Sequence, residues 1–207
     1  MLDSILRPKI QKYFDNLVKN SPFRFINPNT ISISGCLLGI TAAILIYFHF
    51  KYLAALLLLA SGVLDILDGT VARLFQKKSS SGCILDIIFD RIIECSVIFA
   101  LFLISPNQRA LVSVLLLIGV VMCLTSFFVV GMLSNNTSEK SFHYSPGICE
   151  RGEAFIFFIC MIVFPATFQL AGYIFAVLML ITAFIRIVEF LRQNKLSELL
   201  QPHENDE

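Results

Sequence analysis

The stretch that decides the fold runs from residue 65 to residue 90 and reads DILDGTVARLFQKKSSSGCILDIIFD. It places Asp65, Asp68, Asp86 and Asp90 among leucines, isoleucines and phenylalanines. An ionised carboxylate in the hydrocarbon of a membrane costs roughly 2.5–3.5 kcal/mol on insertion scales, and intramembrane acids are functional by default. Four such acids therefore need a strong compensating charge.

The chain as a whole has the composition of an integral membrane protein. Of its 207 residues, 57% are hydrophobic and 15% are charged, and the mean hydropathy is +0.79. The sequence predicts an all-α membrane fold with spans at about 30–48, 52–74, 82–104, 110–133, 152–170 and 171–192. Each of these six segments is near the roughly 20 residues that cross a bilayer. The weak FQLAGY stretch marks the border that we predict between the last two spans.

Polar segments flank this six-helix domain, which covers residues 30–193. Residues 1–29 are basic and carry apolar residues at helical spacing, namely Ile5, Ile10, Phe14 and Leu17. That pattern predicts an amphipathic helix lying on the lipid surface before the first span. Residues 194–207 form a polar C-terminal tail.

Lysine and arginine predict the orientation of the chain. Basic residues gather in the N-terminal segment, in the loop after the second span, before the fifth span and after the sixth: Arg7, Lys9, Lys12, Lys19, Arg24, Arg73, Lys77, Lys78, Lys140, Arg151, Arg192 and Lys195. The opposite loops carry only Lys51 and Arg109. By the positive-inside rule, both termini and the loop beside the aspartates face the cytoplasm.

The spacing of the four acids predicts a metal site. Asp65 and Asp68 are three residues apart and Asp86 and Asp90 are four apart, so each pair shares one face of a helix. Both pairs flank the same loop, so the two faces can converge. Carboxylate oxygens suit Mg²⁺ or Mn²⁺, and four carboxylates balance two such ions. The alternative is a set of acids paired with Arg73 and Arg91, but two arginines cannot neutralise four acids.

The residues between the acids indicate a ligand that carries phosphate. Gly69 and Ala72 are small enough for a close approach of backbone and ligand. Arg73 offers a bidentate fork for a phosphate, and Ser79 precedes Gly82, which we expect to open the next helix. Metal-binding, basic and polar groups at a membrane surface predict a site for a pyrophosphate that bears a lipid tail.

These residues carry a family resemblance. The stretch reads D-x₂-D-G-x₂-A-R-x₈-G-x₃-D-x₃-D, and this pattern resembles the signature of the CDP-alcohol phosphatidyltransferase family. The NPNTIS sequence at 27–32 resembles the entry to the first span in that family. Chain length, six spans and the amphipathic lead-in are similar to its short bacterial and archaeal members, so the resemblance implies a bacterial or archaeal cell membrane.

The resemblance also implies roles for individual residues. Asp65, Asp68 and Asp86 would hold two Mg²⁺ or Mn²⁺ ions per protomer, and Asp90 would contact a metal and act as general base. Contacts to the CDP moiety would come from Asn29, Thr30, Ile31, Ser32, Gly69, Ala72, Arg73, Ser79 and Gly82. The implied reaction moves a phosphatidyl group from CDP-diacylglycerol to a small alcohol and releases CMP.

The acceptor alcohol is less sharply specified. Glu150 and Arg151 resemble the start of an E-R-x-E-R motif in family members that use inositol phosphate, but the last position is Ala154. A phosphorylated acceptor would want more arginines, so we favour an uncharged polyol such as inositol. Glycerol 3-phosphate, inositol phosphate and serine are the alternatives. A solvated ion pair is an equally good interpretation of Glu150 and Arg151.

Other classes of membrane protein fit the sequence less well. A membrane prenyltransferase would need more spans and N-D-x-x-D motifs, and a transporter would place acids near the midplane with internal repeats. The first span carries Gly35 and Gly39 in a GxxxG pattern, which marks close helix packing within or between protomers. The resemblance favours a homodimer in membrane lipid, and we expect no nucleic-acid partner.

Overall fold

The computed structural model describes residues 14–19, 21, 26–134 and 151–200, with side chains described at all of these except 134, 151 and 193–200. The described chain is helical and contains no strand, which confirms the predicted all-α class. After a helical segment at 14–19, its elements are α2 (Pro28–Tyr47), α3 (Lys51–Leu74), α4 (Ser80–Ile104), α5 (Pro106–Ser134), α6 (Arg151–Val163), the 3₁₀ helix η2 (Pro165–Thr167) and α7 (Phe168–Leu200).

The described helices include four that are long and apolar enough to cross a membrane. These are α2, α3, α5 and the stretch Pro165–Arg192, which comprises η2 and most of α7. Of the other two, α4 has sufficient length but carries Asp86, Asp90, Arg91 and Glu94, and α6 has only 13 residues. The chain is an integral membrane protein, because four such helices cannot be covered within one small domain.

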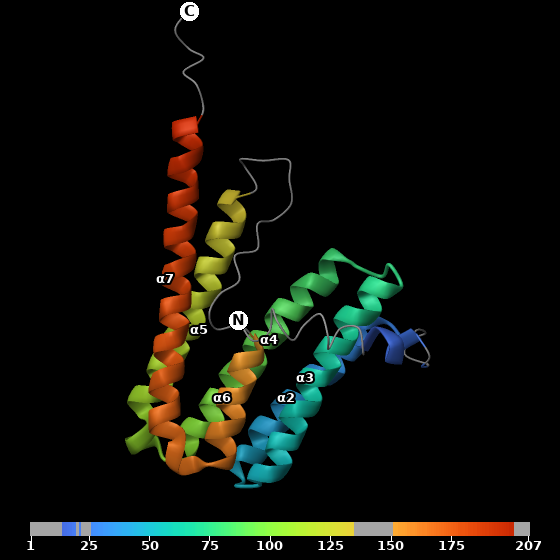
Figure 1. Ribbon diagram of the computed structural model, residues 1–207. Coiled ribbons are helices and arrows are strands. Elements are labelled where there is room, and N and C mark those ends of the chain that lie inside the picture. The colour runs from blue at the N-terminus through green and yellow to red at the C-terminus, as the bar shows by residue number, and fades with distance from the viewer. Residues whose placement is uncertain (1–13, 20, 22–25, 135–150, 201–207) are drawn as a thin grey trace, which may run out of the picture.

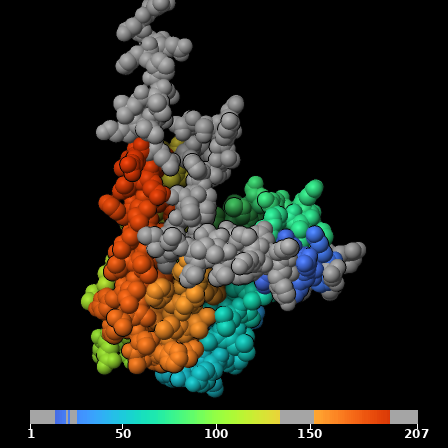
Figure 2. Space-filling model, in the orientation of Figure 1, coloured from blue at the N-terminus to red at the C-terminus, as the bar shows by residue number. Residues whose placement is uncertain are grey.

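The helices form two closely packed groups, which are joined by α6 and by a contact between α4 and α5. Helix α2 packs against both α3 and α4, α5 lies along α7, and α6 contacts both α3 and α7 (Figure 1). In the space-filling view α6, in orange, lies between α3 and the red α7 (Figure 2). Phe158 of α6 and Phe175 of α7 are fully buried, with ring centroids 5.5 Å apart in an edge-on arrangement. This aromatic contact ties the two groups to one core.

The GxxxG pattern of α2 is used inside the protomer. A Cβ added at Gly35 would lie 3.5 Å from Leu64 of α3, and one added at Gly39 would lie 2.6 Å from Ile93 of α4. Both glycines are buried, and they let α2 approach α3 and α4 closely. The predicted close packing is confirmed, and it aligns the ends of the helices that carry the acids.

The predicted border between the last two spans is wrong. We expected spans 152–170 and 171–192, but α6 ends at Val163 and α7 begins at Phe168. The reason is Pro165, which lacks an N–H group and drives Phe164 to extended backbone angles, with φ −117° and ψ 80°. Helix α7 then continues to Leu200, so the first part of the polar tail is helical.

Candidate active site

The acids are brought together by the connection between α3 and α4. Helix α3 ends in a left-handed turn: Gln76 has a φ of 54°, and the Lys77 N–H donates to the Ala72 carbonyl at 2.9 Å. Ser79 then caps α4, because its hydroxyl accepts a hydrogen bond from the Gly82 N–H at 3.0 Å. Helix α4 therefore begins at Ser80 rather than at Gly82. This short connection links the last turns of α3 to the first turns of α4, and α2 packs against both helices.

Three of the four aspartates form a compact cluster. One carboxylate oxygen from each of Asp65, Asp68 and Asp86 lies within 4.8 Å of the other two. Asp68 is 6% exposed and the other two are half-buried. A third helix contributes, because the Ser32 hydroxyl of α2 donates to Asp68 Oδ2. Oxygen-only ligands at this separation match the donor set of a hard divalent cation.

A cavity opens at this cluster. Its lining comes from α2, α3 and α4: Ser32, Gly35, Cys36, Ser61, Asp65, Asp68, Asp86, Phe89, Asp90 and Ile93. All four predicted acids face this space. Asp90 lies outside the compact three-acid cluster, although it lines the same cavity.

Asp90 also lines a second cavity, which the other three acids do not reach. The second cavity is bounded by Leu58 of α3, by Ile93 and Glu94 of α4, and by Phe155 and Phe158 of α6. Phe155 sits against Gly62 of α3, where an added Cβ would lie 2.9 Å from the ring. Asp90 therefore lies between the acid-lined cavity and a second one whose lining is mainly apolar and includes two aromatic rings.

The predicted nucleotide-binding residues differ in how accessible their side chains are to a ligand. Asn29 and Ser79 meet at Gly82, where an added Cβ would lie 3.1 Å from a side-chain oxygen of each. Gly69 is exposed, and a Cβ added there would meet nothing within 4 Å. Ile31, in contrast, is 4% exposed and packs in an apolar cluster, so only its backbone is available to a ligand. Thr30 is exposed and Ala72 is half-buried.

The two arginines near the acids have carboxylate partners of their own. Arg73 Nη2 lies 3.4 Å from Asp15 Oδ1, and Arg91 Nη1 lies 2.7 Å from Glu94 Oε2. Both arginines thus form ion pairs with carboxylates outside the four-aspartate motif. Glu150 and the side chain of Arg151 lie outside the described residues.

Sequence reasoning missed three contributors to the site. Asp15 belongs to the N-terminal segment, and nothing in its spacing links it to Arg73. Phe155 and Phe158 follow the motif-like CERGEA stretch at a spacing that also fits an ordinary core helix. Only the packing of α6 against α3 and α4 reveals that they face Asp90.

Comparison with known proteins identifies the class of this site. The sequence profile of the CDP-alcohol phosphatidyltransferase family matches residues 25–188, which include the whole aspartate motif. The chain belongs to the CDP-alcohol phosphatidyltransferase family. The predicted family, the transferase activity and the role in phospholipid synthesis are therefore confirmed.

Individual relatives extend along nearly the whole chain. The archaetidylinositol phosphate synthase of Pyrococcus horikoshii is 31% identical over 186 residues, covering 90% of this chain and 95% of the relative. The inner membrane protein YnjF of Escherichia coli is 29% identical over 194 residues, covering 90% and 94%. The fold is similar to the crystal structure of Mycobacterium tuberculosis phosphatidylinositol phosphate synthase with CDP-DAG bound, with a TM-score of 0.65, 19% identity and coverage of 96% and 98%.

Proposed function

We propose that this transferase moves a phosphatidyl group from CDP-diacylglycerol to a hydroxyl of an inositol-type alcohol and releases CMP. The observation that carries the proposal is the position of Asp90 between the cavity of the three-acid cluster and the aromatic cavity beside α6. Two relatives support the choice of substrates: a synthase with CDP-DAG bound and an archaetidylinositol phosphate synthase.

The acids fit a pair of Mg²⁺ or Mn²⁺ ions held by Asp65, Asp68, Asp86 and Asp90. The support is the separation of the three clustered oxygens, within 4.8 Å, together with a purely carboxylate donor set. When bound, such ions neutralise the pyrophosphate and stabilise CMP as it leaves. The Ser32 hydroxyl fixes one carboxylate by donating to Asp68, which orients the ligand atom before any metal arrives.

Asp90 acts as the general base in this mechanism. The acceptor hydroxyl lies beside Asp90, its proton passes to the Asp90 carboxylate, and its oxygen forms a bond to the phosphorus of the phosphatidyl group. The bond from that phosphorus to the CMP oxygen breaks. An alcohol is a weak nucleophile, so a positioned base contributes roughly 10²–10⁴-fold to the rate.

The donor nucleotide is held at the ends of three helices. Asn29, Ser79 and Gly82 lie together where α2 meets the start of α4, and Gly69 leaves open space beside Asp68. The guanidinium of Arg73, in the last turn of α3, binds the pyrophosphate. The contacts from Thr30, Ile31, Ser32 and Ala72 complete the set, with Ile31 acting through its backbone.

The acceptor ring occupies the cavity between α3, α4 and α6. Its lining includes Phe155, Phe158 and the carboxylates of Asp90 and Glu94, of which Glu94 is paired with Arg91, and no basic residue lines the cavity itself. This lining favours an uncharged polyol ring. The name of the archaeal relative favours a phosphorylated inositol, for which Arg151 would bind the phosphate and Glu150 would contact the acceptor. Glycerol 3-phosphate and serine are the remaining acceptors.

The placement in the membrane follows from the same arrangement. We propose that α4 and α6 complete six spans around the site, and that both termini and the acids face the cytoplasm of a bacterial or archaeal cell. The basic residues Arg73, Lys77 and Lys78 beside the acids support this orientation. We also propose a homodimer in membrane lipid.

The test compares donor binding with transfer. Purified protein in detergent is supplied with CDP-diacylglycerol, Mg²⁺ and either inositol, inositol phosphate, glycerol 3-phosphate or serine, and CMP release is measured. Asp90→Asn should retain donor binding and lose transfer by roughly 10²–10⁴-fold, whereas Asp86→Asn should lose both. If Asp90→Asn turns over within a few-fold of the wild-type protein, Asp90 is not the base.

A further inference from the structure

The helical segment at residues 14–19 docks on the ends of α2 and α3 beside the proposed donor site. Val18 is fully buried and forms an apolar cluster with Ile31, Leu67 and Val71, separate from the main core. Phe14 packs on the same cluster. The described segment, in blue, lies next to the end of α3 from which the loop to α4 departs (Figure 1). Burial of Val18 therefore fixes the position of the segment, independently of any charge on it.

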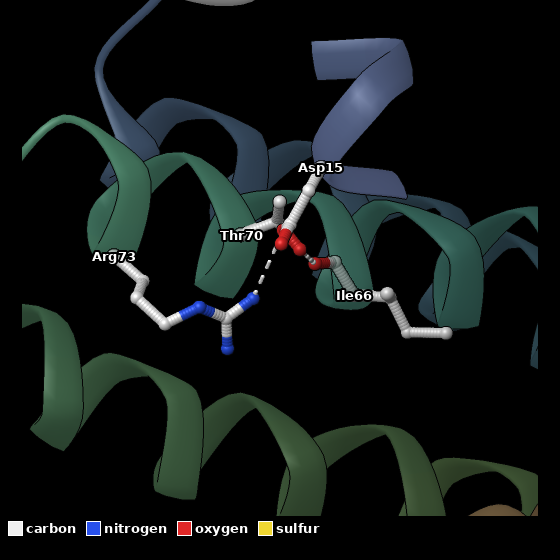
Figure 3. A network of polar contacts seen from close by, with 4 residues as sticks. All are labelled: Asp15, Ile66, Thr70 and Arg73. Atoms are coloured by element: carbon white, nitrogen blue, oxygen red, sulfur yellow. Dashed lines mark hydrogen bonds and ion pairs between the residues drawn. The ribbon is translucent and has the colours of Figure 1, made fainter. Parts of the chain in front are cut away.

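This docking sets Asp15 against Arg73. Asp15 Oδ1 lies 3.4 Å from Arg73 Nη2, and the two side chains are 28% and 39% exposed. Figure 3 shows the guanidinium extending from the last turn of α3 toward the Asp15 carboxylate. The Thr70 hydroxyl donates to the Ile66 carbonyl at 2.7 Å, so its proton is engaged within α3. Asp15 thus contacts the arginine of the D-x₂-D-G-x₂-A-R pattern from an element outside it.

The geometry points to Asp15 as a positioning residue for the nucleotide donor. A half-exposed arginine samples many rotamers, and a carboxylate on a docked segment restricts it to those that reach the mouth of the site. A guanidinium carries five N–H donors, so a bond from Nη2 to Asp15 is compatible with bonds from the same group to a phosphate. Asp15 holds the Arg73 guanidinium in place for the diphosphate of the CDP-activated lipid. This inference rests on the proposed function of Arg73.

The ion pair is exposed enough to limit the size of the effect. Exposed pairs contribute little to stability because solvent screens them, and the corresponding change in an equilibrium is up to about fivefold. Asp15→Ala should therefore raise the KM for CDP-diacylglycerol by about two- to fivefold and leave kcat and the acceptor KM unchanged. Asp15→Asn, which retains an acceptor oxygen, should rescue part of the change.

The experiment is a double-mutant cycle on the full-length protein. The KM for CDP-diacylglycerol, the acceptor KM and kcat are measured for Asp15→Ala, Arg73→Ala and the double variant. Asn16→Ala serves as the control, because Asn16 is an exposed neighbour on the same segment. We expect that Asp15→Ala adds no further increase to the donor KM once Arg73 has been replaced.

Each of the following results would overturn the inference. A lower donor KM in Asp15→Ala would mean that Asp15 competes with the phosphate. Equal increases in the presence and absence of Arg73, or an equal effect of Asn16→Ala, would mean that the segment acts only through docking. If Arg73→Ala raises the donor KM but Asp15→Ala does not, Asp15 has no positioning role and the proposed role of Arg73 stands. If Arg73→Ala itself leaves the donor KM unchanged, the proposed role of Arg73 fails instead.

Discussion

The group α2–α3–α4 and the pair α5–α7 are both built from apolar helices, but their polar side chains have different kinds of partner. In the pair, polar side chains donate to backbone carbonyls: Arg186 Nη1 to Cys123 at 3.1 Å, and the Thr182 hydroxyl to Leu178 at 2.8 Å. In the group, carboxylates from α3 and α4 converge on one another. Carboxylates only accept hydrogen bonds, so backbone carbonyls cannot satisfy them. A cation is the partner that suits the second arrangement.

The two regions also differ in how much surface they leave for lipid. In their most apolar windows, 39% of α2 and 44% of α3 are buried, against 22% of α5 and 28% of the stretch Pro165–Arg192. Helices α2 and α3 are therefore more enclosed than the α5–α7 pair. The α5–α7 pair contacts the α2–α3–α4 group through α4 and through α6. It leaves more of its own surface exposed to the membrane.

The largest expected effect is the loss of activity when an acid of the three-acid cluster is replaced, and an acid on α7 serves as the control. Asp68→Asn should reduce CMP release to the background of membranes that lack the protein, because it removes a ligand from the three-acid cluster. Glu189→Gln on α7 should leave activity near wild type.

EDTA should abolish the activity of the wild-type protein, and Mg²⁺ or Mn²⁺ should restore it. Full activity in chelated protein would contradict the metal interpretation.

The next effect concerns two serines on α2. Ser32→Ala removes the hydroxyl that donates to Asp68, so the Mg²⁺ concentration for half-maximal activity should rise about 10–100-fold. Ser34→Ala is the matched control, because its exposed hydroxyl donates to the Thr30 carbonyl of its own helix. Equal Mg²⁺ dependence in both variants would show that Ser32 does not orient the ligand.

Replacing a glycine should lower the stability of the protein in the α5–α7 pair and weaken donor binding in the α2–α3–α4 group. A Cβ at Gly172 of α7 would collide with Val112 of α5, so Gly172→Ala should destabilise the protein by about 1–3 kcal/mol. Adding Val112→Ala should recover part of the loss in a thermal unfolding assay in detergent. Gly69→Ala meets open space, so its melting temperature should not fall, whereas its donor KM should rise. A stability loss in Gly69→Ala that matches Gly172→Ala would remove this distinction.

The smallest effect compares two buried serines. The Ser61 hydroxyl of α3 donates to the Gly35 carbonyl of α2 at 2.7 Å, whereas the Ser113 hydroxyl of α5 has no hydrogen-bond partner among the described residues. Ser61→Ala should therefore cost about 0.5–1.5 kcal/mol of unfolding free energy. Ser113→Ala should be neutral or slightly stabilising, because it removes an unpaired buried hydroxyl. Unfolding in detergent measures both, and equal losses would contradict the comparison.

Much of this protein was predictable from its sequence because the decisive patterns are local. Spacings of three and four residues put Asp65 with Asp68, and Asp86 with Asp90, on single helix faces whatever the rest of the chain does. Apolar runs of about 20 residues predicted the four helices that are long and apolar enough to cross a membrane, and the eight-position motif led to the correct family. Pro165 at the end of α6 is present in the sequence, but we placed the border between residues 170 and 171, beyond that proline.

Only the tertiary structure decided which separate segments meet. The approach of Ser32 to Asp68 and of Asp15 to Arg73 depends on helix packing over 36 and 58 residues of chain, which no local period encodes. The same holds for the cavity that α6 closes beside Asp90, because Phe155 reaches it through the space left by Gly62. The sequence by itself predicted the helices and placed the four acids in two pairs, each on one helix face. The packing of small residues between helices determined what those acids face.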